Sequence, residues 1–279
     1  TSVQPVDTKI PLTVLIDGAS ASAAEIVTGA VQDLDRGVVI GNRSFGKGLV
    51  QSTRQLPYDG LLKVTIAKYY IPSGRLIQAI DYSHRNPDGS VARIPDSLTT
   101  VFHTAGGREV RDGGGITPDI TIELPDVNRL TYNVVRDNWA FDFANRYAAS
   151  HTSIPSPEEF VVTDTIYEEF KKSIDPARFN YDKVCESAVE QLREIAKAEG
   201  YMNDSTSAQF DVLAGMLKHD LNRDLDINRS NISPYLAGEI VRRYYHQKGE
   251  IINSLREDKT VDSAVTVLTT PRYTEILGK

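Results

Sequence analysis

The sequence has little of what several protein classes require. Its 279 residues include one cysteine, Cys185, which excludes an internal disulfide and a cysteine-based zinc site. No apolar run reaches the roughly 18 residues of a membrane span, and no signal peptide is visible. A net charge of −7 without a dominant basic stripe argues against a nucleic-acid partner. Cys185 falls within a helical apolar pattern, which predicts a buried, unreactive thiol.

What the sequence does contain is typical of a soluble globular protein of about two domains. Thr1 is not a natural start, so we expect a piece of a longer protein. Residues 1–125 combine short apolar runs with one helical pattern, which predicts an α/β layer. The expected strands are 11–16, 38–40, 49–56, 61–71 and 120–124, and the expected helix is 22–34. A polar stretch, 81–115, predicts an exposed excursion.

Residues 126–279 are predicted to form a helical C-terminal region, because apolar residues recur there at three- and four-residue steps. Tyr181 opens one such stripe, which Gly200 ends. Ser156–Glu159 has the pattern of a capping box with proline at the first helical position. Ser233-Pro234 predicts the start of a further helix.

Ser22 lies where the loop after the first predicted strand passes into the predicted helix, within Asp17–Ile26. Helix N-termini offer free N–H groups and a partial positive charge, so the N–H of Ala23 could stabilise an oxyanion. A serine hydroxyl needs a base to take its proton. None of the five histidines is near Ser22 in sequence, although folding could bring one close.

Lys47 is the candidate base. A lysine amine can serve only when it is uncharged near neutral pH, and desolvation favours that state. Gly46 and Gly48 flank Lys47 and permit the close backbone approach that would bury the amine. Alternate residues of a strand face one side, so Gln51 could orient the Lys47 amine.

Each assignment has a simpler alternative. Ser22, like Ser20, could cap the helix, and Lys47 could be a solvated loop lysine. Gln51 could satisfy only a backbone group. Glu25 is interpreted as first-turn charge on the helix rather than as a chemical group. Arg75 could bind a substrate carboxylate, or it could form a structural salt bridge.

Four ordered motifs resemble those of the C-terminal processing peptidases, also called tail-specific proteases, peptidase family S41. The motifs are Asp17–Ile26, Arg43–Gln51, Tyr70–Arg75 and Gly115–Asp119. In the family pattern the second serine is the nucleophile, which falls on Ser22, not Ser20. The base then falls on Lys47 and the supporting glutamine on Gln51. The motifs lie within residues 10–125, and the rest of the chain resembles the helical extensions of some members.

The resemblance implies a crotonase-like protease core in residues 1–125, followed by a helical domain in residues 126–279. It implies a Ser/Lys endopeptidase that cleaves unfolded or C-terminally exposed polypeptides through an acyl-enzyme, with no metal or cofactor. The family's PDZ domain and the opening half of its core have no counterpart here. A glycine of that missing half usually supplies the second oxyanion donor. Missing strands would leave sheet edges unpaired, so a homodimer is expected.

Localisation follows from the resemblance alone, which implies the bacterial periplasm or cell envelope. Two non-catalytic alternatives stay open. The same fold family includes retinoid-binding repeats that have lost proteolysis, so the chain could be a ligand-binding module. It could also be a scaffold for another protease, with the helical region as the contact surface. Intact Ser22, Lys47 and Gln51 argue against the ligand-binding module.

Overall fold

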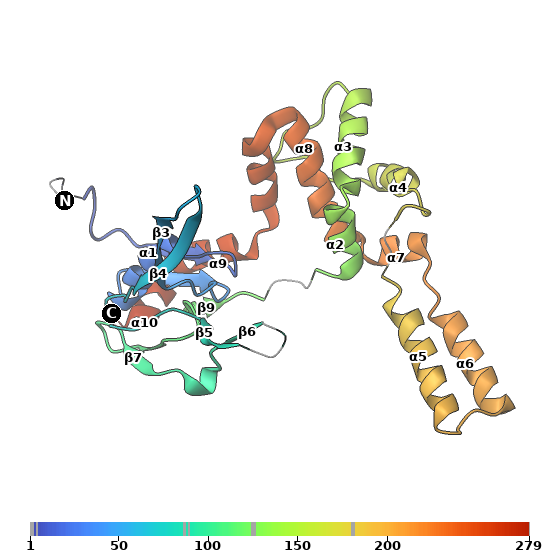
Figure 1. Cartoon of the computed structure of the whole chain (residues 1–279). Helices are drawn as coiled ribbons and strands as arrows, with labels where there is room; N and C mark the ends of the chain where they lie inside the picture. Colours follow the sequence, from blue (N-terminus) through green and yellow to red (C-terminus); the bar gives the residue numbers. More distant parts are fainter. Residues whose placement is uncertain are drawn as a thin grey trace. The chain divides into compact units, whose positions relative to one another are not determined.

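The computed structural model describes residues 3, 5–85, 88, 90–123, 127–179 and 182–278. The chain forms two compact units (Figure 1), which are described separately below. The first unit comprises residues 1–124 and 258–279, and the second comprises residues 125–257. The boundary predicted between residues 125 and 126 falls outside the described residues. The sequence placed residues 258–279 with the other helices, whereas in the structure they pack with the strands of the first unit.

The first unit is a mixed α/β structure around a short parallel sheet. The sheet has the order β1-β2-β9, and three antiparallel hairpins, β3–β4, β5–β6 and β7–β8, extend the unit. The elements are β1 (Thr13–Ile16), α1 (Ala23–Asp33), β2 (Val38–Gly41), β3 (Leu49–Gln55), β4 (Leu61–Lys68), β5 (Ile80–Arg85), β6 (Val91–Arg93), β7 (Val101–His103), β8 (Glu109–Arg111), β9 (Ile120–Thr121), α9 (Lys259–Thr269) and α10 (Arg272–Leu277). The predicted strands and the helix are therefore confirmed, with shorter ends, and the expected excursion contains small hairpins.

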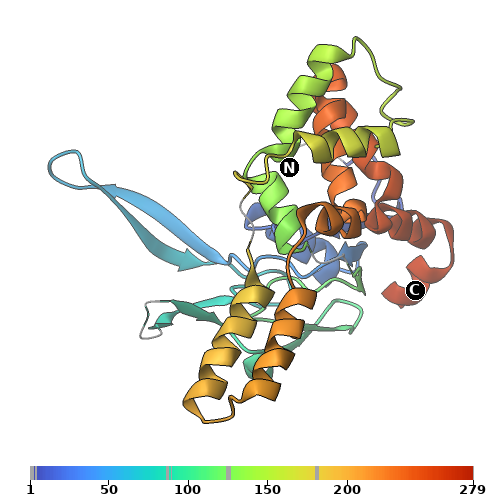
Figure 2. The same ribbon diagram turned by 90° about the vertical axis from the view of Figure 1, so that its right-hand side faces the viewer.

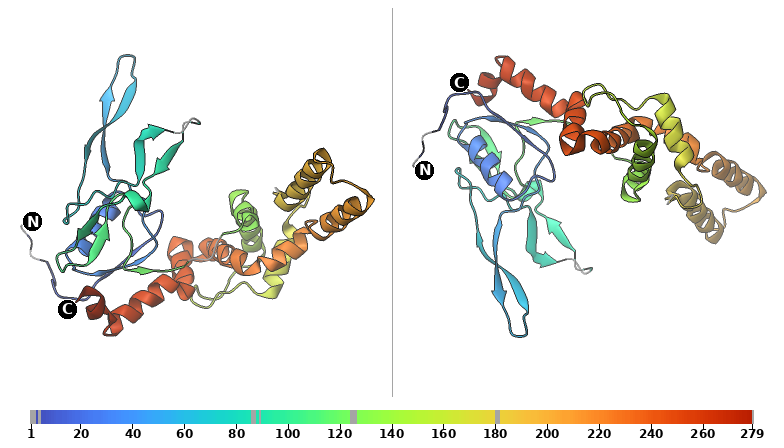
Figure 3. Two further views of the ribbon diagram at one scale, coloured as in Figure 1. Left: turned by 90° about the horizontal axis from the view of Figure 1, so that it is seen from below. Right: turned by 90° about the horizontal axis from the view of Figure 1, so that it is seen from above.

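Strand β2 is buried on both faces, and its residues alternate between two apolar clusters. Val39 packs with residues that include Ile71 and Ile116, on the side that helix α1 covers. Val38 and Ile40 pack on the other side, against α9 and α10 (Figure 3). The residues that the two helices contribute to this second cluster are Ala264, Val267 and Leu277. This packing explains why the end of the chain belongs to the first unit.

Helix α1 turns a polar face toward the sheet. Its buried residues are Glu25, Thr28, Gly29, Gln32 and Asp33. The apolar pattern that predicted the helix faces outward instead, and Val27 is 61 % exposed. Gly29 makes the close approach possible, because a Cβ there would lie 2.6 Å from Ile71 Cδ1. The chain thus leaves an apolar helix face uncovered.

Buried ion pairs connect α1 to the loops beside it. Arg75 is 1 % exposed and donates to Asp33 at 2.8 Å. Arg108 bridges Asp35 and Asp119 at 2.7 and 2.6 Å. Removing one partner of such a pair strands a buried charge, at a cost of about 3–5 kcal/mol. These pairs fix the end of α1 against the loop after β4 and the β7–β8 hairpin.

The β3–β4 hairpin projects from the rest of the first unit (Figure 2). Every residue of β4 is exposed. Leu62, Val64 and Ile66 alternate along the strand, so they form an apolar row on one face. An isolated two-stranded hairpin is marginally stable in water, and this hairpin also exposes an apolar row to solvent.

The second unit is entirely helical in its regular structure, apart from connecting turns, over the described residues. Its helices are α2 (Arg129–Arg136), α3 (Trp139–Ser150), α4 (Asp164–Ser173), α5 (Val184–Ala198), α6 (Asp204–Met216), α7 (Leu221–Ile227) and α8 (Arg229–Ser254), with a final 3₁₀ turn at Leu255–Glu257. Side chains of Asn128, Thr163, Asn203 and Asp220 cap four of them. Nowhere in the described ranges does a helix have the length and apolarity to cross a membrane.

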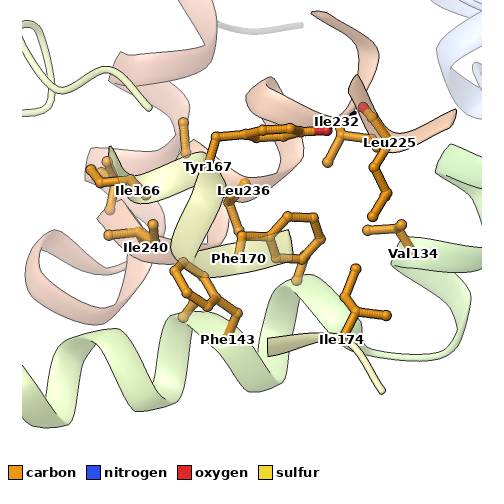
Figure 4. Packing of buried hydrophobic residues seen from close by; sticks show 14 of the residues in the cluster. Val134, Phe143, Ile166, Tyr167, Phe170, Ile174, Leu225, Ile232, Leu236 and Ile240 are labelled. Atoms are coloured by element: carbon orange, nitrogen blue, oxygen red, sulfur yellow. Dashed lines mark hydrogen bonds between the residues drawn. The ribbon is translucent and has the colours of Figure 1, made fainter. Parts of the chain in front are cut away.

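The core of the second unit lies between α3, α4 and α8 (Figure 4). Phe143 and Phe170 meet edge to face, with ring centroids 5.6 Å apart. The buried Tyr167 hydroxyl donates to the Leu225 carbonyl at 2.6 Å, which satisfies its polar end. These contacts explain why the predicted apolar stripes from Arg129 onward form a packed domain.

Four predictions about this region need correction or comment. Cys185 is exposed, because α5 packs against α6 and buries little beyond Val189. Residues 156–159 form a turn rather than a helix. The carbonyls of Pro157 and Phe160 accept hydrogen bonds from the Asn253 side chain and not from a following helical turn. Helix α8 begins at Arg229, ahead of the predicted start, and contains Pro234. The stripe residue Tyr181 lies outside the described residues.

We expect the buried ion pair of Asp35 to make the first unit sensitive to acid. Burial by itself raises the pKa of the Asp35 carboxyl, but hydrogen bonds from Arg108, Gly106 and Thr104 together hold that pKa below its ordinary value of 3.8. A carboxyl with a lowered folded pKa stabilises the protein above the unfolded pKa, and this contribution disappears as the pH falls through the folded pKa. The free energy of unfolding should therefore fall below about pH 4.

The measurement is urea unfolding at pH 7, 4 and 3 for the wild type and Asp35→Asn. The variant should lose about 3–5 kcal/mol at pH 7, because Arg108 is left without part of its counter-charge. It should also lose less further stability on acidification than the wild type. Asp59→Asn, in an exposed turn, is the control. An acid dependence that is the same in wild type and Asp35→Asn contradicts the assignment.

Candidate active site

Ser22 is the residue that caps the N-terminus of α1. Its backbone has φ 57° and ψ −115°, a conformation that a residue with a side chain rarely adopts. Such strain costs of order 1–3 kcal/mol and persists where the surroundings enforce it, which is common at functional sites. Ser22 thus occupies the N-cap position of α1 in a strained conformation.

Ala23 is the first residue of helix α1. The Ala24 N–H donates to Ala21, and the Ile26 N–H donates to the Ser22 carbonyl at 3.0 Å. Within the described part of the chain, the Ala23 N–H has no hydrogen-bond acceptor. A free N–H at the positive end of a helix is suited to stabilise negative charge beside the Ser22 hydroxyl.

Glu25 joins the two segments that carry the candidate nucleophile and base. Its Oε2 accepts the N–H groups of Ser22 and Lys47, each at 2.8 Å. Its Oε1 accepts the Gly46 N–H at 2.7 Å and the Ser44 hydroxyl at 2.5 Å. The side chain is 1 % exposed. Sequence analysis missed this role, although the Ser22–Glu25 spacing is that of a capping box and indicated the first of these bonds.

The loop around Lys47 is held against the start of β5. Gly46 has φ 86°, and a Cβ there would lie 2.3 Å from the Ala79 Cβ. Gly48 donates to the Gln78 side chain at 2.8 Å. The close backbone approach predicted from the flanking glycines is therefore confirmed. The expected burial of the amine is not found, because Lys47 is exposed in the part of the chain that the structure describes.

A cavity of about 540 Å³ lies beside Lys47. Lys47, Leu49 and Gln51 all line this cavity, as expected from the prediction that they face the same side of the strand. They do so even though the β3–β4 register shifts between Val50 and Gln51. The other lining residues are Ala19, Ala21, Phe45, Gly46, Gln78, Ile80 and Tyr82. A second cavity of about 630 Å³ shares several of these residues, including Leu49 and Ile80. The two form a largely apolar depression next to the loop that carries Ser22.

The remaining candidates have structural contacts. The Ser20 hydroxyl bonds to Asp17 at 2.9 Å, so this serine stays structural. Arg75 forms the salt bridge with Asp33, the alternative that the sequence left open, and it does not line the cavity beside Lys47. Its role in substrate binding stays a prediction. No described histidine side chain lines that cavity.

No hydrogen bond joins the side chains of Ser22, Lys47 and Gln51 in the described structure. The tight network is instead made by the backbone around them, through Glu25. A search of the described residues finds no group of three side chains able to hold a metal ion. The arrangement can supply a strained serine, a free N–H, a nearby lysine and an apolar depression.

Comparisons with known proteins find matches over both parts of the chain. Residues 1–91 match the model of "Peptidase family S41", and residues 130–268 match that of "Probable PDZ-protease, C-terminal helical domain". The carboxy-terminal-processing protease of Bartonella bacilliformis is 46 % identical over 102 residues, which are 36 % of this chain and 23 % of that protein. A probable CtpA-like serine protease of Staphylococcus aureus is 26 % identical over 202 residues, 71 % of this chain and 31 % of that protein.

Over residues 1–91 the chain is similar to peptidase family S41, and its relatives include carboxy-terminal-processing proteases. It is similar also to the chloroplastic carboxyl-terminal-processing peptidase 3 of Arabidopsis thaliana, with 50 % identity over 90 residues, 32 % of this chain and 17 % of that protein. The chain spans less than a third of the length of these relatives. A solved photosystem II D1 C-terminal processing protease matches 40 % of this chain and 20 % of its own at 28 % identity, with a TM-score of 0.27, too low to compare folds.

Replacement of Glu25 by glutamine should loosen the segments at Ser22 and at Lys47 at once. The amide offers one acceptor oxygen to four donors and turns an N–H₂ group toward the others, so we expect a loss of about 3 kcal/mol in the free energy of unfolding. Hydrogen exchange at the Gly46 and Lys47 amides should also become faster. Urea unfolding and exchange measurements test this. Glu123→Gln, at an exposed position of the same unit, is the control; equal stability of the two variants contradicts the prediction.

Proposed function

We propose that the chain is the nucleophile- and base-carrying part of a Ser/Lys endopeptidase that cleaves unfolded or C-terminally exposed polypeptides through an acyl-enzyme. The observation that carries the proposal is the buried Glu25 carboxylate, which accepts hydrogen bonds from the backbones of Ser22 and Lys47 together. A carboxylate that fixes both segments supports the pairing of a nucleophile with its base.

In this mechanism Ser22 Oγ attacks the scissile carbonyl while the uncharged Lys47 amine accepts the serine proton. The Ala23 N–H stabilises the oxyanion, and Lys47 then returns the proton to the leaving amine. Water repeats the sequence on the acyl-enzyme. Gln51 lines the same cavity as Lys47, which supports its role as the residue that orients the amine. The chemistry requires neither a metal nor a cofactor.

The core is proposed to be crotonase-like, and the rest of a protein of the relatives' length would complete it. Two observations support this. The apolar face of α1 is exposed although the helix begins at the candidate nucleophile. Lys47 is also exposed, whereas a base of this kind needs a water-poor setting. A segment that covers this surface would bury both the apolar face of α1 and Lys47, and it would bring the second oxyanion donor.

The proposed substrates are polypeptides, since the depression beside Lys47 is mostly apolar and suits an unfolded chain's side chains. The relatives are processing proteases of bacteria and chloroplasts by name, which supports a bacterial periplasm or cell-envelope location. No nucleic-acid or metal partner is proposed.

Casein cleavage by the full-length protein tests the dyad. Ser22→Ala and Lys47→Ala should each lower the rate at least about a thousandfold, because the two residues act as one unit. Lys63→Ala, an exposed lysine of the β3–β4 hairpin, should leave it unchanged.

Unchanged cleavage in Ser22→Ala or Lys47→Ala contradicts the dyad. If the wild type cleaves nothing but binds a lipid tightly, the ligand-binding alternative gains. If it copurifies in fixed ratio with another protease, the scaffold alternative gains.

We also propose that the isolated chain forms a homodimer. Strand β1 has one neighbour among the described strands, β2, and the apolar row of Leu62, Val64 and Ile66 is uncovered. Exposed edges and apolar rows of this kind pair with another chain. Light scattering should give twice the mass of one chain. Val64→Lys should give a monomer, whereas Thr65→Lys, on the opposite face of β4, should stay dimeric; a monomeric wild type refutes the proposal.

A further inference from the structure

The Gln78 side chain joins the loop that carries Lys47 to the start of β5. Its Oε1 accepts the Gly48 N–H at 2.8 Å, and its Nε2 donates to the Ile80 carbonyl at 3.0 Å. The residue is 7 % exposed. With the amide turned over, an N–H₂ group would face the Gly48 N–H, so only one orientation of the amide satisfies both bonds. Gln78 therefore presents its oxygen to the residue that directly follows Lys47.

Hydrogen bonds hold the peptide units on either side of Lys47. The Ala79 N–H donates to the Gly46 carbonyl at 3.0 Å, in the unit before Lys47. In the unit after Lys47, the carbonyl accepts the Tyr69 hydroxyl and the N–H donates to Gln78. A peptide unit is planar, so bonds at both of its ends stop it from rotating, which a bond at one end alone does not. Gln78 supplies the second of these bonds.

Gln78 also lines both cavities beside Lys47. The other residues that the two cavities share are Leu49, Gln51, Ile80 and Tyr82. A Cβ at Gly48 would lie 2.9 Å from the backbone nitrogen of Gln78, so the loop lies directly against this part of the cavity wall. The side chain that fixes the peptide after Lys47 is therefore part of the wall that a substrate side chain would meet.

We infer that Gln78 is a positioning residue that fixes the backbone of Lys47 from the wall of this cavity. The inference rests on the proposed function of Lys47 as the base. Glu25 acts on the N–H of Lys47, whereas Gln78 acts on the other side of the Lys47 Cα, through the Gly48 N–H. Without the Gln78 oxygen, the peptide after Lys47 can rotate and the Lys47 Cα loses one of its two fixed neighbours.

The expected consequence is a loss in the chemical step rather than in binding. Misplacement of reacting groups by about 1 Å can cost about a hundredfold in rate. Methionine at position 78 would fill a similar space without any hydrogen-bonding amide, so substrate binding should change little. Asparagine keeps the amide but is one methylene shorter, so its oxygen cannot reach the Gly48 N–H unless the backbone moves. In both variants the Gly48 amide hydrogen should exchange with water about tenfold faster.

The test compares Gln78→Met and Gln78→Asn with Gln55→Met in the full-length protein. Gln55 is an exposed glutamine at the end of β3, so it is a matched loss of one amide. Active sites are first counted by labelling to completion with a fluorophosphonate that reacts with activated serines, and kcat and KM are then measured per labelled site. We expect both Gln78 variants to lower kcat per site about 10- to 100-fold, with KM within about threefold, and Gln55→Met to match the wild type.

Three kinetic results overturn the inference. Fewer labelled sites with an unchanged kcat per site would mean that Gln78 only supports folding. A kcat equal to that of Gln55→Met would mean that Gln78 has no part in catalysis. A raised KM with an unchanged kcat would make Gln78 a substrate-binding residue instead of a positioning residue. Cleavage that survives Ser22→Ala would defeat the proposed function itself, separately from Gln78.

Hydrogen exchange in the wild type decides the matter if neither Gln78 variant folds. A Gly48 amide that exchanges much more slowly than the amide of Asp59, in an exposed turn, supports the bond to Gln78. A Gly48 amide that exchanges as fast as that of Asp59 removes the bond on which the inference depends.

Discussion

The first unit depends on one buried carboxylate. Glu25 lies in the first turn of α1, where the helix dipole favours negative charge, and its two oxygens receive four donors. Three of these four donors are backbone N–H groups. A different side chain could not accept all three unless the backbone moved. The turn at Ser22 and the loop at Lys47 therefore cannot shift independently. Strain at the serine is maintained because the glutamate bonds to its N–H.

The polar face of α1 extends this constraint to the rest of the unit. One end of the face carries Glu25, and the other carries Asp33, which pairs with the buried Arg75. A helix anchored by directed bonds at both ends is fixed in rotation as well as in position, which nonspecific apolar packing achieves less sharply. The arrangement also leaves the apolar face free to pack against something other than this sheet.

Sequence patterns predicted the strands, α1, the nearness of the glycines to another backbone and the common side of Lys47 and Gln51. Each of these follows from local periodicity or from the conformational freedom of glycine. The patterns could not reveal that Glu25 reaches the Lys47 loop, because that contact joins segments far apart in the chain. They also misjudged Cys185 and the Ser156 segment, where burial and helix formation depend on tertiary partners such as Asn253. Which side of α1 faces the sheet also depends on tertiary contacts, so the sequence pattern could not predict it.

The proposed dyad has two separate requirements, the placement of its backbone and a water-poor setting. Backbone placement is complete here, since Glu25 and the glycines around Lys47 hold the two segments without any help from the candidate side chains. The low-dielectric surroundings that a lysine base needs are missing, because Lys47 is exposed and its amine has no described partner. Covering the α1 face and the Lys47 side chain would add exclusion of water to a geometry that already exists. Activation would then depend on what covers the site, while the positions of the reacting groups would not.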